Sequence, residues 1–198
     1  MSKLPKKKII GITGSMGSGK SMVSSMIRKR FPVLDLDQVN RSLIEKGNKG
    51  YRALSRKLDI PFDKDRNIDK KVFSKRMFSD NEYKEKVERI IHPLILDEMK
   101  EWIDRHQDVL VFIEVPLLFE TNMDVFFDEI WCVVCDEAIA LQRLQTKRNY
   151  SLEEAKSRLA CQYSPIIKLQ QSDVVLYNNG TIEELEEQVS VYLERSLS

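Results

Sequence analysis

Short apolar segments alternate with longer amphipathic ones along this 198-residue chain. Five of the apolar segments are nearly continuous in Val, Ile and Leu, a pattern that predicts strands buried on both faces. They are Lys8 to Thr13, Val33 to Leu36, Val109 to Val115, Glu129 to Cys135 and Asp173 to Tyr177. Because helical patterns separate them, the sequence predicts an α/β fold with a mostly parallel five-stranded sheet. Ligands of such sheets bind beyond the carboxyl ends of the strands.

The connection between the second and third strands is more than seventy residues long, far more than one crossover helix requires. It predicts an inserted helical subdomain over residues 40–106. Pro93 is expected to kink or break its last helix near His92. Capping-box patterns, in which Glu follows a hydroxyl residue by three positions, predict helix starts at Ser79–Glu82, Ser151–Glu154 and Thr181–Glu184.

The first strand leads into Gly14-Ser15-Met16-Gly17-Ser18-Gly19-Lys20-Ser21, a complete G-x-x-x-x-G-K-[ST] phosphate-binding loop. Its glycines permit the positive φ angles that turn backbone N–H groups toward phosphate oxygens. Lys20 is expected to reach the β- and γ-phosphates, and the Ser21 hydroxyl to bind Mg²⁺. The helix that follows directs its positive N-terminal dipole at the same oxygens. These features predict a nucleoside triphosphate site.

Acidic residues after other strands bear on the reaction. Asp35 and Asp37 follow the second strand, and residues two apart on an extended chain point the same way, so both carboxylates are expected to face the loop. One of them would accept a proton from an acceptor hydroxyl or hold Mg²⁺ through water, while helix capping by Asp37 is an alternative. Glu114 closes the third strand at the place of a Walker B carboxylate. Asp136, after the fourth strand, fits the role of a helix cap better than that of a catalytic carboxylate.

Basic residues near a predicted helix-to-helix turn are placed as in a lid. Arg143, Lys147 and Arg148 would there neutralise charge on a transferring phosphoryl group. A solvated basic helix face explains the same charges equally well.

Composition narrows the class of protein. The 32 Lys and Arg residues nearly balance the 31 Asp and Glu residues, which argues against a dedicated nucleic-acid binder. The basic segment 3–8 precedes no apolar stretch long enough for a signal peptide or membrane span, which predicts a cytoplasmic protein with no membrane partner. Cys132 and Cys135 spell C-x-x-C, but residues three apart on a strand point to opposite faces. We interpret them, with Cys161, as structural thiols.

In this order the motifs resemble the dephospho-coenzyme A kinase family, P-loop kinases with a nucleotide core, a helical acceptor domain and a small lid. The resemblance covers nearly the whole chain. Besides the loop it rests on Val33-Leu34-Asp35-Leu36-Asp37 with Arg41, Ile91-His92-Pro93-Leu94-Ile95, Val115-Pro116-Leu117-Leu118-Phe119-Glu120, Arg143, and Ser172-Asp173-Val174-Val175 leading to Asn178-Asn179-Gly180. It implies a core of residues 1–39, 107–140 and 172–198, an acceptor subdomain of 40–106 and a lid of 141–171.

The resemblance implies transfer of the ATP γ-phosphate to the ribose 3′-hydroxyl of dephospho-coenzyme A, giving coenzyme A. Asp37 matches the family's proposed general base, and Arg143 a lid arginine that closes on ATP, with Arg148 as a second candidate. Mg²⁺ would be held by Ser21, and through water by Asp37 or Glu114. The remaining implied contacts are Gly14, Gly17, Ser18, Gly19, Lys20, Ser21 and Met22 for ATP, and Asp35, Asp37, Arg41, His92, Pro116 and Leu117 for the acceptor. A monomer is the default expectation.

The chain departs from the family's usual pattern at Ser15, Met22, Glu114 and Lys168, where Gly, Thr, Asp and Arg respectively are expected. The longer arm of Glu114 alters the metal geometry available there. Other small-molecule P-loop kinases, for nucleosides, nucleoside monophosphates or shikimate-like alcohols, would share the loop, lid and base. A switch GTPase would need N-K-x-D, and Asn48-Lys49-Gly50-Tyr51 lacks the Asp. A non-enzymatic nucleotide-binding module would not depend on Asp37.

Overall fold

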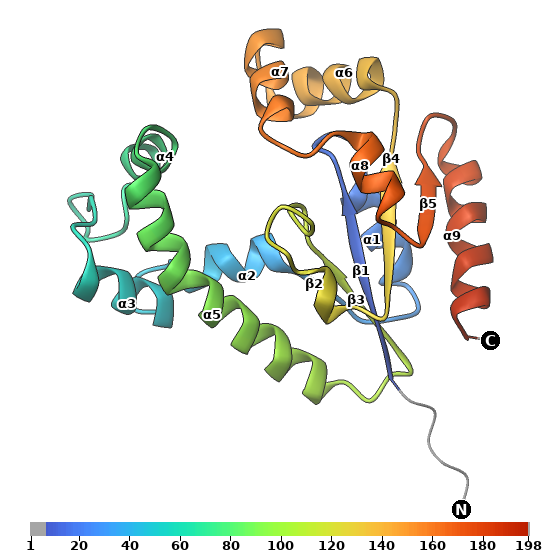
Figure 1. The fold of residues 1–198 in the computed structure, drawn as a ribbon, viewed down its shortest axis with the longest axis horizontal. Coiled ribbons are helices and arrows are strands. Elements are labelled where there is room, and N and C mark those ends of the chain that lie inside the picture. Colours follow the sequence, from blue (N-terminus) through green and yellow to red (C-terminus); the bar gives the residue numbers. More distant parts are fainter. Residues whose placement is uncertain (1–6, 198) are drawn as a thin grey trace, which may run out of the picture. The chain divides into compact units, whose positions relative to one another are not determined.

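A computed structural model describes residues 7–197 of the chain, so most of the basic segment 3–8 lies outside the described residues. The chain divides into two compact units. One is Leu36–Arg105, and the other comprises the chain before and after it. Each unit has its own hydrophobic core, and Figure 1 labels the elements of both.

The first unit is built on a parallel five-stranded sheet in the order β2-β3-β1-β4-β5 (Figure 1). The predicted fold class is confirmed. The strands match the five predicted segments to within a residue or two at each end, and they are β1 (Lys8–Gly14), β2 (Val33–Asp35), β3 (Leu110–Glu114), β4 (Glu129–Val134) and β5 (Val174–Tyr177). Glu114 pairs with Ile12 on one side and Asp35 on the other, and Gly14 pairs with Val133. The carboxyl ends of four strands therefore meet at one edge.

Both faces of the sheet are buried, as the continuous apolar strands predict. On one face α1 (Lys20–Ile27) and α9 (Ile182–Leu197) pack on alternate strand residues. On the other face a Cβ atom at Gly11 would lie 2.9 Å from Leu118 and Phe127, so the segment after β3 closely covers the strand there. Phe112 and Trp131 meet edge-to-face at 5.4 Å between ring centroids within the core.

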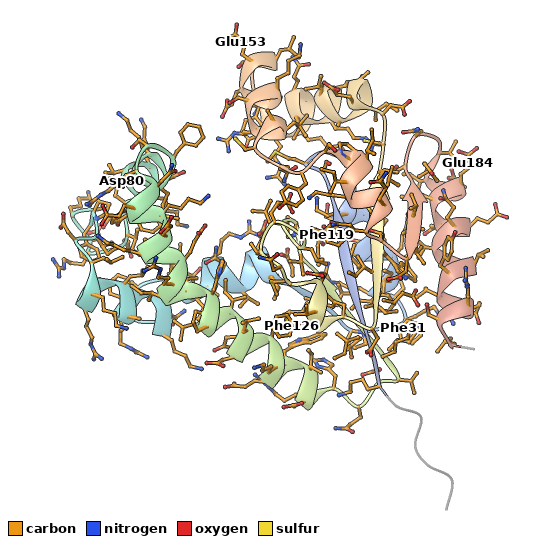
Figure 2. All side chains as sticks on the ribbon, viewed as in Figure 1. Phe31, Asp80, Phe119, Phe126, Glu153 and Glu184 are labelled. Atoms are coloured by element: carbon orange, nitrogen blue, oxygen red, sulfur yellow. The ribbon has the colours of Figure 1, made fainter. Side chains whose placement is uncertain are left out.

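The remaining helices of this unit follow β4 in succession. They are α6 (Glu137–Arg148), α7 (Leu152–Ala160) and α8 (Pro165–Gln170), and a short 3₁₀ helix, η1 (Asp124–Phe126), precedes β4. Ser151 Oγ accepts from Glu154 N at 3.1 Å, which confirms the predicted start of α7. Thr181 and Glu184 exchange both bonds of a capping box at the start of α9, where Figure 2 labels Glu184. Within residues 7–197 no helix has the length and apolar character needed to cross a membrane.

The second unit is helical and has a separate core around Leu54, Tyr83 and Val87. Its helices are α2 (Leu36–Leu43), α3 (Lys49–Lys57), α4 (Lys70–Ser79) and α5 (Asn81–Arg105).

One local expectation for this unit is wrong, and one of two alternatives for another is excluded. The cap of α5 is Asp80 rather than Ser79, because Ser79 still belongs to α4 and Asp80 Oδ1 accepts from Tyr83 N at 2.9 Å (Figure 2). Of the kink or break expected at Pro93, the structure excludes the break, because α5 continues through Pro93 to Arg105. A proline removes one backbone donor, and a long helix packed on its neighbours can absorb that loss.

Candidate active site

The loop of residues 14–21 joins β1 to α1 and contains the backbone conformations expected from its glycines. Gly14, Gly17 and Gly19 have φ angles of 144°, 81° and 101°. Successive residues in such conformations direct their N–H groups into an anion-binding concavity. Gly19 is also the N-cap of α1, so the loop continues into the end of a helix that favours negative charge.

Close packing behind the loop explains why these positions carry no side chain. A Cβ atom at Gly14 would lie 2.2 Å from the Val133 carbonyl oxygen. One at Gly17 would lie 2.8 Å from the carbonyl oxygen of Ala140. The end of β4 and the start of α6 therefore determine the path of the loop.

Side chains from distant segments hold the loop through its carbonyl oxygens. Arg143 of α6 donates from Nη1 to the carbonyls of Gly17 and Ser18, both at 3.4 Å. Asn178, directly after β5, donates from Nδ2 to the Ser18 carbonyl at 2.7 Å and accepts from Arg143 Nη2 at 3.2 Å. An anionic ligand binds N–H donors rather than carbonyls, so these contacts are compatible with a bound triphosphate.

Arg143, expected as the lid arginine that closes on ATP, lies directly beside the phosphate loop in this structure. Its side chain is half-buried beside the loop and bonded to the loop's own backbone. Arg148, the second candidate, lies exposed in the last turn of α6, just before Asn149 ends that helix with a φ of 55°. In this structure Arg143 supports the loop, and Arg148 is the arginine accessible to solvent.

Lys20 lies across the loop. Its Nζ donates to the carbonyl oxygens of Gly14 at 2.8 Å and Ser15 at 3.0 Å, and only 9% of the residue is exposed. The ammonium charge is thus held against the first two residues of the loop. Ser21 is exposed at the second position of α1, whereas Met22 packs against the hydrophobic core.

Glu114 at the end of β3 is a buried carboxylate, 7% exposed. Its Oε2 accepts from Ser24 Oγ of α1 at 2.6 Å. Burial raises the pKa of this carboxyl, as does the negative charge of Asp35 on the neighbouring strand, while the bond from Ser24 and the charge of Lys20 oppose the rise. Glu114 thus binds Ser24, which lies one turn further along α1 than Ser21.

A buried ion pair holds the segment that follows Glu114. Lys168 of α8 is completely buried, and its Nζ lies 2.8 Å from Glu120 Oε1 and donates to the Pro116 carbonyl at 3.1 Å. Glu120 Oε1 also accepts from Tyr163 N at 2.9 Å. Leu117, a predicted acceptor contact, is exposed beside the half-buried Pro116.

Of the other predicted acceptor-side residues, Asp35 ends β2 in the first unit, whereas Asp37, Arg41 and His92 belong to the second unit. Asp37 lies exposed in the first turn of α2, and Arg41 donates from Nε to the Asp37 carbonyl at 3.2 Å. His92 is exposed on α5. The expectation that Asp35 and Asp37 share an orientation on extended chain is wrong, because α2 begins at Leu36 and strand alternation ends at Asp35.

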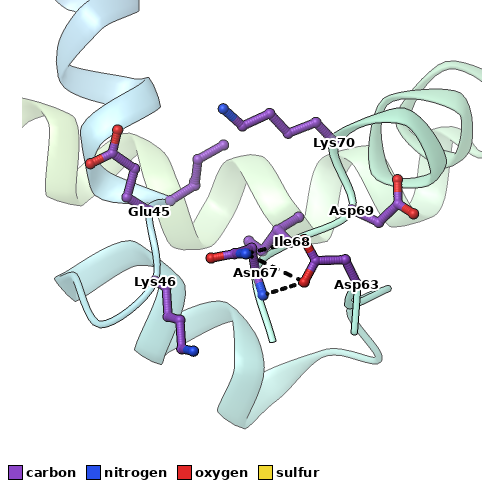
Figure 3. A pocket seen from close by; sticks show the side chains of 8 residues that line it. Glu45, Lys46, Asp63, Asn67, Ile68, Asp69 and Lys70 are labelled. Atoms are coloured by element: carbon purple, nitrogen blue, oxygen red, sulfur yellow. Dashed lines mark hydrogen bonds between the residues drawn. The ribbon is translucent and has the colours of Figure 1, made fainter. Parts of the chain in front are cut away.

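A cavity of about 480 Å³ opens in the second unit (Figure 3). Asp63 on its wall accepts from the backbone and side-chain amides of Asn67, which lowers the pKa of the Asp63 carboxyl. This carboxylate therefore shapes its own turn, where Arg66 has a φ of 63°. Lys46 and Lys70 line the same cavity and give it two cations.

Sequence reasoning predicted no contact for three polar residues that the structure brings to the loop or to its supports, although it named Lys168 as a departure from the family pattern. Ser24 binds Glu114, Lys168 binds Glu120, and Gln162 Oε1 accepts from Met16 N at 2.9 Å. A serine in a helix or a glutamine in a turn carries no sequence signal for such a contact. The one available signal was Lys168, a lysine in the otherwise apolar α8 segment Pro-Ile-Ile-Lys-Leu.

Comparison with known proteins agrees with these features. The family model described as Dephospho-CoA kinase matches residues 8–184. A dephospho-CoA kinase from Oceanobacillus iheyensis is 34% identical over 192 residues, which cover 94% of this chain and 96% of the relative. Two solved structures share the fold. TT1252 from Thermus thermophilus has a TM-score of 0.84 and 30% identity, covering 96% of this chain and 98% of that one. A dephospho-CoA kinase from Campylobacter jejuni has a TM-score of 0.68 and 23% identity, covering 96% and 97%.

The family match spans both units, from β1 into α9, and includes the phosphate loop, the segment after β3 and the predicted base. The alternative assignments to other kinases, to switch GTPases and to non-enzymatic modules are thereby set aside. The chain belongs to the dephospho-CoA kinase family.

Proposed function

We propose that this chain transfers the γ-phosphate of ATP to the ribose 3′-hydroxyl of dephospho-coenzyme A, the last step of coenzyme A synthesis, with Asp37 as the general base. Family membership over residues 8–184 supports the overall reaction and its two substrates. The observation that carries the nucleotide half is the loop of residues 14–21, whose three left-handed glycines and overlying Lys20 suit a triphosphate.

On this proposal the loop of residues 14–21 binds ATP, the phosphoryl donor. Backbone N–H groups and the α1 N-terminus hold the phosphates, and Lys20 exchanges its bonds to the Gly14 and Ser15 carbonyls for the β- and γ-phosphate oxygens. Arg143 and Asn178 keep the loop in place while this exchange occurs. Residues 141–171 act as the lid and exclude water from the transfer, with Arg143 as the arginine that closes on ATP and the exposed Arg148 as the second candidate.

Mg²⁺ fits the chemistry of the oxygen donors near the loop. Ser21 offers a hydroxyl, and Glu114 and Asp35 offer carboxylates on paired strand positions. Hydroxyl and carboxylate oxygens are the ligands that this hard cation prefers, and it usually keeps several waters. We assign Ser21 as a direct ligand and Glu114, or alternatively Asp37, as a ligand through water. When bound, Mg²⁺ neutralises charge on the β- and γ-phosphates.

Asp37 would accept the proton of the 3′-hydroxyl. Its place in the first turn of α2 suits a carboxylate, because the N-terminal end of a helix stabilises negative charge. Arg41 and His92 on the same unit, and Pro116 and Leu117 after β3, are proposed to contact dephospho-coenzyme A. A single protein chain, acting as a monomer in the cytoplasm, is the simplest arrangement for this reaction.

A coupled assay of ADP release tests the function directly. Mg-ATP is supplied with dephospho-coenzyme A, adenosine, a nucleoside monophosphate or shikimate, and the product is checked by mass. We expect release only with dephospho-coenzyme A, with coenzyme A as product, and no release from the Lys20→Ala variant. Release with another acceptor, or with none, would reject the assigned substrate while leaving the fold unchanged.

A further inference from the structure

The loop between α7 and α8, residues 161–164, contacts the phosphate loop through one side chain. Gln162 Oε1 accepts from the backbone N–H of Met16 at 2.9 Å, across 146 positions of sequence. Gln162 is half-buried, and it lines a cavity of about 520 Å³ together with Ser15 and Ser18 of the phosphate loop. The contact therefore lies at the wall of a pocket rather than on an open surface.

Met16 occupies a defined place within the phosphate loop. Ser18 N donates to the Ser15 carbonyl at 3.2 Å and closes a tight turn, in which Gly17 has a φ of 81°. Met16 and Gly17 are the central residues of that turn, and the closing bond does not use the Met16 N–H. Gln162 supplies the acceptor that this N–H would otherwise take from water.

The residue beside Gln162 is fixed to a different loop. Tyr163 N donates to Glu120 Oε1 at 2.9 Å, and the same oxygen is paired with the buried Nζ of Lys168. Consecutive residues of the α7–α8 loop are thus bonded to the phosphate loop after β1 and to the segment after β3. Arg143 and Asn178 hold the phosphate loop through its carbonyls, whereas Gln162 holds it through an N–H.

We propose that Gln162 is a positioning residue that couples residues 141–171 to the phosphate loop, by holding the Met16 backbone so that the loop is preformed for ATP. The proposal rests on the proposed function for its biological meaning. Its physical basis is that a loop ordered before binding loses less conformational freedom when the ligand arrives. Loss of the bond would leave the central turn free to sample other conformations, at the expense of triphosphate affinity.

The test replaces Gln162 by Met, which keeps the length of the side chain and removes the acceptor. We expect the Kd of ATP, measured by calorimetry, to rise ~2–10-fold, the range set by one hydrogen bond. Hydrogen exchange of the Met16 amide in the ligand-free protein should accelerate by a similar factor. The midpoint of thermal unfolding should stay within about 2 °C, because few buried contacts are lost.

Two further variants isolate the bond. Gln162→Glu keeps an acceptor oxygen, so slow exchange of the Met16 amide should return even though its charge weakens ATP binding. Gln170→Met changes an exposed glutamine of α8 and should leave both measurements at their wild-type values. Wild-type exchange at Met16 in Gln162→Met would overturn the proposal. The exchange measurement needs neither substrate nor turnover, so its result tests this proposal independently of the activity assay.

Discussion

At Gly19 two independent features exclude a side chain. The residue has a φ of 101°, and a Cβ atom would lie 2.0 Å from Asn178 Nδ2, which itself holds the Ser18 carbonyl. Gly19→Ala therefore adds backbone strain of about 1–2 kcal/mol and displaces Asn178 from the loop. We expect a lower melting temperature and an ATP Kd raised at least tenfold.

Gly47 provides the matched control for this substitution. It also has a positive φ, 88°, but an added Cβ would meet nothing within 4 Å. Gly47→Ala should show the backbone strain in thermal unfolding with ATP affinity unchanged. Equal effects of the two variants on ATP binding would mean that contact with Asn178 does not shape the phosphate loop.

The proposed base can be tested without disturbing the donor site. Asp37 is exposed, so Asp37→Asn removes a charge with little effect on packing. The rate of phosphoryl transfer should fall by ~10² or more, the usual contribution of a positioned base, while ATP binding measured by calorimetry is retained. Asp104→Asn, an exposed carboxylate at the end of α5, serves as control. Transfer at the wild-type rate in Asp37→Asn would exclude the assigned role.

At the scale of the elements, α8 carries a buried ion pair. Lys168 is fully buried against Glu120, and removing one partner of a buried ion pair costs about 3–5 kcal/mol. Lys168→Met should lower the free energy of unfolding in urea by that order. The double variant with Glu120→Gln should recover part of the loss, because no unpaired charge then remains.

Lys29 gives the comparison for an exposed pair. It meets Glu186 at 2.7 Å with both side chains substantially exposed, so Lys29→Met should cost less than about 1 kcal/mol. If Lys168→Met proved no more costly than Lys29→Met, Lys168 would not hold the segment after β3.

The elements differ in how far their residues specify them locally. The five strands and the caps at Ser151 and Thr181 follow from short-range pattern and were predictable within a residue or two. The start of α5 was misplaced because Ser79 and Asp80 both suit a cap, and only the length of α4 decides between them. Continuity of α5 through Pro93 likewise depends on packing that periodicity does not report.

The residues of the candidate site also differ in how far the local sequence specifies their contacts. The glycines and Lys20 of the phosphate loop are specified by adjacent residues, so the motif alone predicted their conformations. The contacts of Arg143 and Gln162 join residues more than a hundred positions apart, and nothing near either residue encodes its partner. For this reason the bonds of Arg143 to the loop carbonyls and the contact of Gln162 were not predicted.

At the scale of the whole chain, one carboxylate joins both ends of the described sequence to the sheet. Glu129 at the start of β4 binds Lys8 of β1, accepts from Trp131 Nε1 at 2.5 Å and accepts from Ser196 Oγ of α9 at 3.0 Å. Burial is the largest single influence and would raise the pKa of this carboxyl. The bonds from Lys8, Trp131 and Ser196 together outweigh it, and the pKa is lowered from 4.5.

The lowered pKa of Glu129 determines how its contribution to the free energy of unfolding changes with pH. Above about pH 4.5 the carboxylate is ionised in both states, and the folded state alone supplies its hydrogen bonds, so the stabilisation is fully present. As the pH falls through the folded-state pKa of Glu129, protonation of the carboxylate removes this stabilisation. Glu129→Gln should therefore lower the free energy of unfolding by about 1–3 kcal/mol at pH 7, and by less as the pH falls below 4. Urea titrations across this range measure the change, with Glu187→Gln on the exposed side of α9 as control. A loss that stayed constant with pH would show that Glu129 contributes through packing, because packing does not titrate.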